Sequence, residues 1–232
     1  MAKKPSKPKP SNGKKSKDKK QDKRLKALEK FVYSTIENKQ VNYKNTNLAI
    51  STTGVRDGQF LQVAQGVSDG SVTGDPARIG NTITLMNQKF NFHFSQNPTG
   101  IIDDWNRIRV IVAEAVDGNQ ALLLSDILRY HTYAIDGNLV FTSPYTTKTT
   151  TNRRYRICMD KTFELNYRAN GASKVFEYNE NYSKKGGKLL EFDGNTSSVP
   201  TNHQMSLFFI SDSASVPHPA VWYSVRSTYK DA

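Results

Sequence analysis

Cysteine is nearly missing from this chain of 232 residues, since Cys158 is the only one. A single cysteine excludes an internal disulfide and a CxxC metal-binding motif, so we expect burial of apolar side chains to hold the fold in a reducing compartment. The longest apolar candidates, 108–113 and 121–124, fall far short of the roughly 18–20 residues that a membrane-spanning helix needs. The first 24 residues also lack the apolar segment of a secretory signal. We therefore predict neither a membrane-spanning segment nor a secretory route.

Motifs for catalysis, phosphate binding and metal binding are missing as well. The sequence has no GxSxG, no GxxxxGK[ST] and no GxGxxG at the start of a helix. The four histidines form no HxH or HExxH pattern: His93, His131, His203 and His218. The adjacent carboxylates Asp103 and Asp104 are predicted to lie in a solvated loop rather than to bind Ca²⁺. We predict no enzyme, no cofactor and no metal site.

Positive charge is concentrated at one end of the chain. Residues 1–30 hold 13 Lys and Arg against three Asp and Glu, whereas the remaining 202 residues hold 20 against 18. The chain therefore consists of a cationic segment of formal charge +10 and a body of only +2. Twelve of the 13 basic residues are Lys, which acts as a point charge rather than a bidentate reader of bases.

Residues 1–23 are predicted to be a disordered arm, because they contain three prolines and no Val, Ile, Leu, Phe, Tyr or Trp. A flexible polycation binds nucleic acid in a salt-sensitive way that does not depend on base sequence. The same composition also fits a solubility tail or a nuclear-import signal. The residues predicted to bind nucleic acid are ten lysines of this arm and the adjoining Arg24: Lys3, Lys4, Lys7, Lys9, Lys14, Lys15, Lys17, Lys19, Lys20, Lys23 and Arg24.

The body, residues 24–232, is predicted to be all-β. Leu25, Leu28, Val32 and Ile36 favour a short helix at its start, but residues 31–38 alternate equally well as a strand. Beyond residue 40 apolar and polar residues alternate, as in strands with one buried face. The expected strands are 31–38, 47–52, 60–66, 79–94, 107–117, 138–142, 153–168, 173–182, 204–212 and 220–229.

Turn-forming residues separate these strands, and the one convincing helical insert covers 121–130. Strands without long helices between them argue against a parallel sheet. About eight antiparallel strands in a domain of this size predict a single jelly-roll sandwich. The polar segments 53–59, 67–78, 95–106 and 142–152 are predicted to be loops on its outer surface.

Five sequence blocks follow one another in a recognisable order. They are Gln65-Gly66, Arg78-Ile-Gly-Asn-Thr-Ile83, Arg109-Val-Ile-Val112, Ser125-Asp-Ile-Leu128 and the strand Arg153–Leu165. Together with the basic arm, this order resembles capsid proteins of small circular single-stranded DNA viruses that encode a Rep protein. It is also similar to shell subunits of the satellite tobacco necrosis virus type. The arm differs from the usual pattern because it is rich in Lys rather than Arg.

The resemblance implies a jelly-roll subunit that self-assembles into an icosahedral shell of about sixty copies, with the arm inside on the genome. It implies a virion protein, a genome of single-stranded DNA rather than RNA, assembly in the host nucleus, an unidentified host receptor and no membrane partner. Arg153, Arg154 and Arg156 form the densest basic cluster of the body. They are predicted either to contact phosphates or to pair with acidic residues at a subunit boundary.

Aromatic residues allow two uses. Trp105, Trp222 and Tyr223 fit core or intersubunit packing, and they also fit base stacking in a single-strand binder. Two other classes of protein fit the sequence: a non-viral carbohydrate-binding β-sandwich with an import tail, and an architectural nucleic-acid-binding protein. The second requires a charged face on the body, against which its formal charge of +2 argues.

Overall fold

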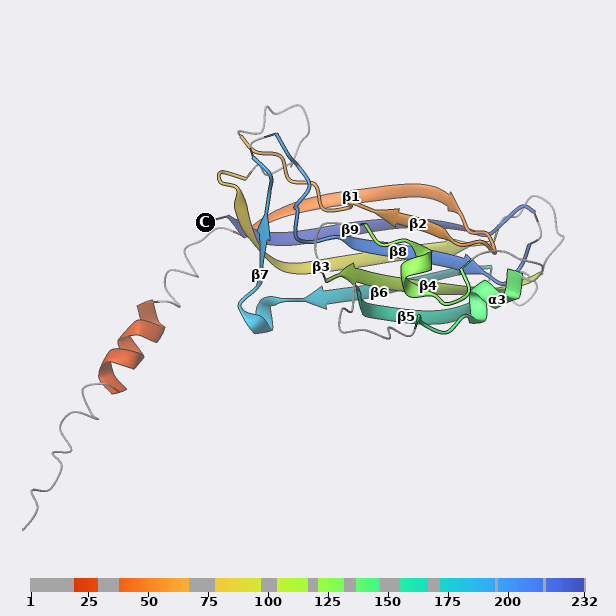
Figure 1. The fold of residues 1–232 in the computed structure, drawn as a ribbon, viewed down its shortest axis with the longest axis horizontal. Helices are drawn as coiled ribbons and strands as arrows, with labels where there is room; N and C mark the ends of the chain where they lie inside the picture. Colours follow the sequence, from red (N-terminus) through yellow and green to blue (C-terminus); the bar gives the residue numbers. More distant parts are fainter. Residues whose placement is uncertain are drawn as a thin grey trace, which may run out of the picture. The chain divides into compact units, whose positions relative to one another are not determined.

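The computed structural model describes residues 19–28, 38–66, 78–96, 104–116, 121–131, 137–146, 155–166, 172–194, 196–214 and 216–231. The chain divides into two units, residues 1–37 and residues 38–232. In the first unit, residues 19–28 form a helix whose side chains are exposed (Figure 1). This helix crosses the expected boundary at residue 24. Residues 1–18 lie outside the described residues, so the disorder of the arm stays a prediction.

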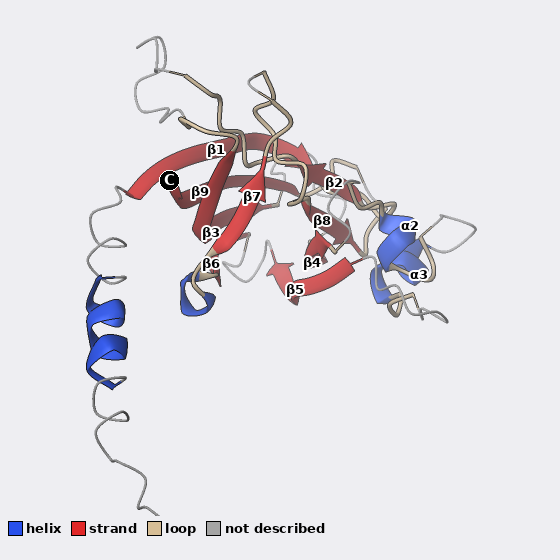
Figure 2. Ribbon diagram, turned by 60° about the vertical axis from the view of Figure 1, so that its left-hand side comes forward, coloured by secondary structure: helices blue, strands red, loops and turns tan. Residues whose placement is uncertain are grey.

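The second unit is built from two antiparallel sheets (Figure 2). Sheet 1 has the order β1-β9-β3-β6, with β7 paired to the first part of β3. Its strands are β1 (Asn38–Ala49), β9 (Ala220–Asp231), β3 (Thr82–Ser95), β6 (Ser173–Asn181) and β7 (Lys188–Glu191). Sheet 2 has the order β2-β8-β4-β5. Its strands are β2 (Val55–Gly58), β8 (Met205–Ser211), β4 (Trp105–Ala115) and β5 (Tyr155–Asn166).

The pairing along the chain is nested. β1 pairs with β9, β2 with β8, β3 with β6 and β4 with β5, all antiparallel. The chain thus behaves as one long antiparallel ribbon that is wrapped so that alternate pairs fall in opposite sheets. This order is that of a jelly roll, which confirms the predicted fold class.

An aromatic core joins the inner faces of the sheets. Phe90, Phe92 and Phe94 point inward from β3, and their neighbours in sequence point outward, as the alternation predicts. The Phe92 ring lies 4.9 Å from that of Phe176, and the Phe94 ring lies 4.6 Å from that of Phe163. The first contact lies within sheet 1, between β3 and β6, and the second ties sheet 1 to β5 of sheet 2.

A second apolar cluster covers the outer face of sheet 2. Ile111, Phe208 and Ile210 point outward from β4 and β8 and pack against Ile127 and Val140. The last two come from α2 (Leu124–Ile127) and α3 (Gly137–Thr142), two short helices in the segment 121–146. Where β4 and β8 are covered on both faces, at 110–113 and 207–210, their sequences are apolar at every position rather than at alternate ones.

Several predicted elements are wrong. The strand predicted over 138–142 is α3, because a short apolar run fits a helix and a strand equally well and only its packing on sheet 2 decides. The loop predicted over 53–59 contains β2, whose Asp57-Gly58 resembles a turn signal. Residues 60–66 are buried in part but belong to no strand; the Val63 amide donates to the carbonyl of Ser198 instead.

The first strands are also placed differently from the prediction. β1 runs without a break from Asn38 to Ala49, where the sequence suggests one strand ending at residue 38 and another beginning at 47. The rest of the predicted strand 31–38 lies outside the described residues. β7 was not predicted at all. By contrast, β3, β4, β5, β6, β8 and β9 overlap the predicted strands closely.

Candidate nucleic-acid interface

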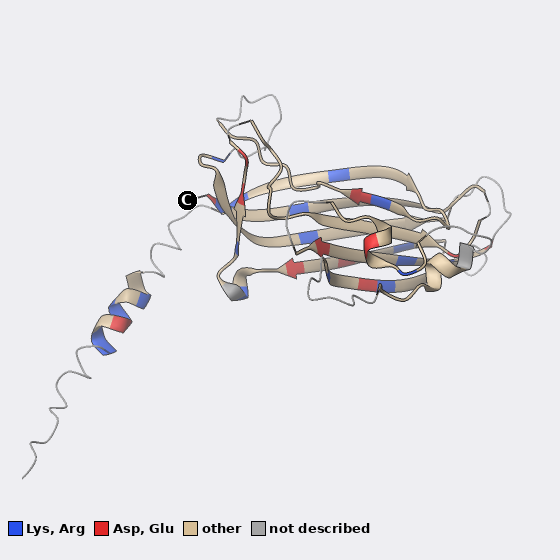
Figure 3. Ribbon diagram, in the orientation of Figure 1, with Lys and Arg blue, Asp and Glu red and all other residues tan. Residues whose placement is uncertain are grey.

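The described part of the predicted arm is a basic helix. Lys19, Lys20, Lys23 and Arg24 are exposed on residues 19–28 (Figure 3). Lys19 and Lys23, like Lys20 and Arg24, are four residues apart, where like charges on a helix repel each other. A bound polyanion relieves this repulsion. Lys3, Lys4, Lys7, Lys9, Lys14, Lys15 and Lys17 lie outside the described residues, as do Arg153 and Arg154.

Arg156 pairs with carboxylates of its own chain. Its Nη2 lies 2.6 Å from Oε2 of Glu114 on β4 and 2.8 Å from Oε1 of Glu180 on β6. The Lys188 ammonium at the start of β7 also pairs with Glu114. Two cations and two carboxylates therefore balance within a cluster that links both sheets. A role for Arg156 in nucleic-acid binding stays a prediction, and its charge is already compensated within the subunit.

Burial sets the charges in this cluster. His203 lies with Nδ1 3.1 Å from Glu114 and Nε2 3.0 Å from the side-chain oxygen of Gln88. Burial and the nearby Lys188 and Arg156 lower the pKa of His203 to about 3. The contact with Glu114 is therefore a hydrogen bond of a neutral ring. Burial also lowers the pKa of Lys188 to about 8.

Two arginines of the five sequence blocks, Arg78 and Arg109, hold loops in place through hydrogen bonds to carbonyl oxygens. Arg78 is fully buried and donates to the carbonyl oxygens of Gly194 and Ser197 at 2.8 and 2.7 Å. Its guanidinium also lies 4.3 Å from the centre of the Phe192 ring. The sequence gives no sign that Arg78 is buried, because Arg is among the residues least often buried.

Arg109 on β4 holds the covering segment onto sheet 2. It donates to the Asp160 carboxylate on β5 and to the carbonyl oxygens of Phe141 and Ser143, the last two at 2.9 and 2.8 Å. Tyr145 donates to the same carboxylate. Arg109 and Asp160, which belong to two of the five sequence blocks, thus form an ion pair between adjacent strands and stabilise the fold.

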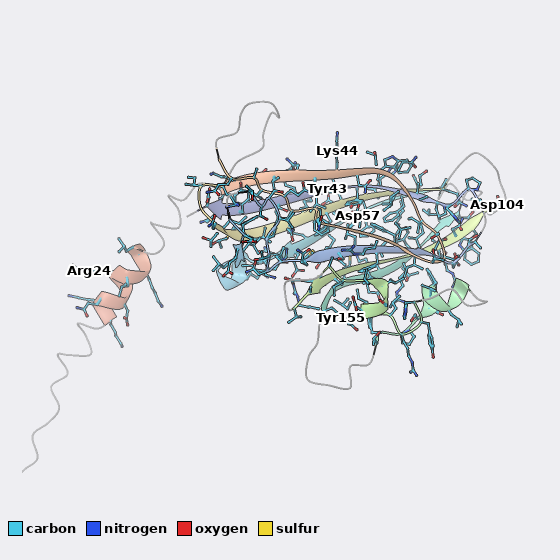
Figure 4. All side chains as sticks on the ribbon, turned by 45° about the horizontal axis from the view of Figure 1, so that its top comes forward. Arg24, Tyr43, Lys44, Asp57, Asp104 and Tyr155 are labelled. Atoms are coloured by element: carbon cyan, nitrogen blue, oxygen red, sulfur yellow. The ribbon has the colours of Figure 1, made fainter. Side chains whose placement is uncertain are left out.

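The remaining candidates are dispersed. Trp105 is 54% exposed, Trp222 is partly buried on the outer face of sheet 1, and Tyr223 is buried and donates to Asp57. Figure 4 shows Tyr43 and Asp57 beneath β1, while Lys44 points away from the strand. Asp104 is described but Asp103 is not, so the predicted solvated loop stays a prediction. Burial raises the pKa of the Cys158 thiol to about 12, as expected for an unreactive cysteine.

Within the ranges that the structure describes, no three His, Cys, Asp or Glu side chains gather where a metal ion could bind. No helix of those ranges is long and apolar enough to span a membrane.

Known proteins were compared with this chain by sequence and by structure. No family model and no curated protein matches it. Several solved structures are similar, among them a chain titled Desmodium yellow mottle tymovirus, 9% identical, matched over 85% of the present chain and 87% of its own, with a TM-score of 0.40. The nested strand pairs, and not this likeness, establish the fold.

Proposed function

We propose that this chain is the subunit of a small icosahedral virus shell that packages single-stranded nucleic acid. The observation that carries the proposal is the combination of a jelly-roll body of formal charge +2 with an N-terminal segment of +10. Jelly rolls also occur in lectins and cupins, so the fold alone does not select this function. The separation of charge favours a virus shell, because a container for nucleic acid needs walls with little net charge and a cationic inner lining.

The walls are supplied by the sandwich. Its charged residues are largely compensated within the subunit, as at Arg109 with Asp160 and at Arg156 with Glu114 and Glu180. A body with little net charge can approach identical copies closely without strong repulsion. Repeated contacts of one kind then close into a shell of point-group symmetry, which we place at about sixty copies.

The lining is supplied by the arm. About sixty N-terminal segments, each comprising residues 1–30 and carrying a charge of +10, would bring roughly 600 positive charges, enough to neutralise several hundred phosphates. Because these charges are almost all Lys, binding would be independent of base sequence. The family resemblance supports a genome of single-stranded DNA, a location in the virion, and assembly in the host nucleus.

The test compares the full chain with a variant of the same length in which the ten lysines of residues 1–23 are replaced by glutamine. Both should show the same β-type circular dichroism spectrum, because the core lies within the second unit. The full chain should bind oligo-dT with an affinity that falls steeply with salt, and the variant should lose most of that dependence. An unchanged salt slope in the variant would show that the arm is not the packaging element.

Assembly is tested separately by light scattering of the full chain with and without oligo-dT at modest salt. A particle in the megadalton range supports the shell. A monomer of about 26 kDa that persists at every salt concentration contradicts it and favours a carbohydrate-binding sandwich.

A further inference from the structure

The outer face of sheet 1 differs from that of sheet 2 because no described segment of residues 38–231 packs over it. On β9, Tyr223 and Val225 point into the core, while Trp222, Ser224 and Arg226 point outward. The outward residues of β1, β3 and β6 follow the same alternation. Across the register, the outer face includes Asn42, Lys44, Lys89, Asn91, His93, Val175, Glu177, Asn179, Trp222, Ser224 and Arg226.

Three cations lie side by side on this face. Arg226 is directly opposite Asn42 on β1 and Lys89 on β3, and Lys44 is its diagonal neighbour on β1. Lys89 pairs with the exposed Glu177 at 2.8 Å. Among the described residues, neither Lys44 nor Arg226 has a carboxylate partner; Arg226 donates only to the side-chain oxygen of Asn42, at 3.3 Å. Like charges on adjacent strands destabilise a sheet, so these cations do not contribute to the stability of the fold.

An aromatic pair lies further along the same strands. Trp222 is opposite His93, with ring centres 5.7 Å apart and planes inclined by 38°. Val175, opposite His93 on β6, is 65% exposed. His93 is four residues from Lys89, which places the ring pair roughly 13 Å from the cations at 3.3 Å per residue.

We propose that this face is a binding platform for single-stranded nucleic acid, with phosphates on Lys44 and Arg226 and a base on Trp222. The inference rests on the proposed packaging function and adds a specific place where the cargo contacts the body. Uncompensated cations on the same face as a partly exposed ring are the combination that single-strand binders use, because bases without a partner strand offer a face for stacking. A second copy of the chain fits less well, since an identical face brings the same three cations and their repulsion.

The test uses the intrinsic fluorescence of the only two tryptophans, Trp105 and Trp222. In the full chain carrying Trp105→Phe, emission comes from Trp222 alone, and saturating oligo-dT of about 15 nucleotides should quench it by roughly half through base stacking. In the chain carrying Trp222→Phe, the same oligonucleotide should quench emission by less than about a tenth. Residues 1–30 contain no aromatic residue, so binding by the arm does not itself report here.

A charge-matched pair of variants tests the cations. Lys44→Gln with Arg226→Gln should weaken binding of oligo-dT about five- to tenfold and reduce the salt slope by roughly 1.4, which corresponds to two phosphate contacts. The control, Arg129→Gln with Lys184→Gln, removes the same charge from exposed positions outside this face. Its affinity should stay within about twofold of the parent chain.

The outcomes separate this proposal from the packaging function. Salt-sensitive binding without quenching of Trp222 overturns the platform and leaves the arm as the binding element. Absence of any binding overturns both. Equal quenching by duplex DNA, or a change of Trp222 emission with protein concentration alone, also contradicts the platform; the latter would assign the face to a second copy. Quenching by oligo-rU as well as oligo-dT supports it, because both present unpaired bases.

Discussion

The two sheets have comparable inner faces and opposite outer faces. On sheet 2, Phe208 points outward and is as deeply buried as its inward neighbour Phe209, because α2 and α3 cover it. On sheet 1, Phe92 is buried but its neighbour His93 is exposed. On the covered face, Arg109 is paired with Asp160. On the uncovered face, Lys44 and Arg226 have no carboxylate partner among the described residues.

The largest expected difference between the sheets is in the free energy of unfolding that is lost when an inward or an outward residue is replaced by alanine. Phe208→Ala and Phe209→Ala should each lower the free energy of unfolding by about 3–5 kcal/mol, because both leave a cavity. On sheet 1, Phe92→Ala should have the same effect, whereas the outward Asn91→Ala should stay within about 0.5 kcal/mol. Urea unfolding measures all four. A large loss for Asn91→Ala would mean that something also covers sheet 1.

The next largest effect is the dependence of stability on pH that the buried His203 causes. Its pKa is about 3 in the folded chain, below the ordinary value of 6.5, so the unfolded chain binds more protons between these values. Stability should therefore fall as the pH drops from 6.5 towards 4, by up to about 3 kcal/mol from this group. His203→Gln should flatten that part of the profile relative to the parent chain. A slope equal to that of the parent chain would contradict the assignment.

A smaller effect is expected where the covering segment is anchored. Arg109→Leu removes the hydrogen bonds to Asp160, Phe141 and Ser143, and should cost roughly 1.5–3 kcal/mol. It should also speed hydrogen exchange at the described amides of 121–146 while leaving β9 protected. Uniform deprotection of both sheets would indicate global unfolding rather than release of this segment.

The smallest effect separates stability from function on the uncovered face. Arg226→Gln removes a cation that faces Lys89 and Lys44, so it should raise the free energy of unfolding by about 0.2–0.5 kcal/mol. The same variant should weaken binding of oligo-dT. A loss of stability instead would show that Arg226 belongs to the folding of the sheet.

Much of this fold was predictable because a strand with one buried face shows alternating apolar and polar residues in its sequence. On β3 and β9 the alternation of apolar and polar residues coincides with alternating buried and more exposed side chains, as at Phe92 and His93. The errors fall where local signals conflict with packing. Asp57-Gly58 resembles a turn, yet it lies in β2 because β8 supplies the pairing and Tyr223 a partner for the carboxylate.

The candidate site was predictable only in part. The separation of charge and the basic arm follow directly from counting residues. The pairing of Arg156 with carboxylates of its own chain could not be predicted in this way, because Glu114 and Glu180 are 42 and 24 residues away in sequence. One available signal was missed: Glu114 interrupts the apolar run of β4, and a charge in such a strand indicates a buried ion pair.

The sequence by itself determined the composition of the two units, their charges and the periodicity of the strands, since these depend on residues that are neighbours along the chain. Only the tertiary structure decided which strands pair, which outer face is covered and which cations remain without carboxylates. These properties depend on groups brought together from distant parts of the chain. Lys44 and Arg226 are unremarkable in sequence and become a pair only when β1 and β9, the first and last strands, lie side by side.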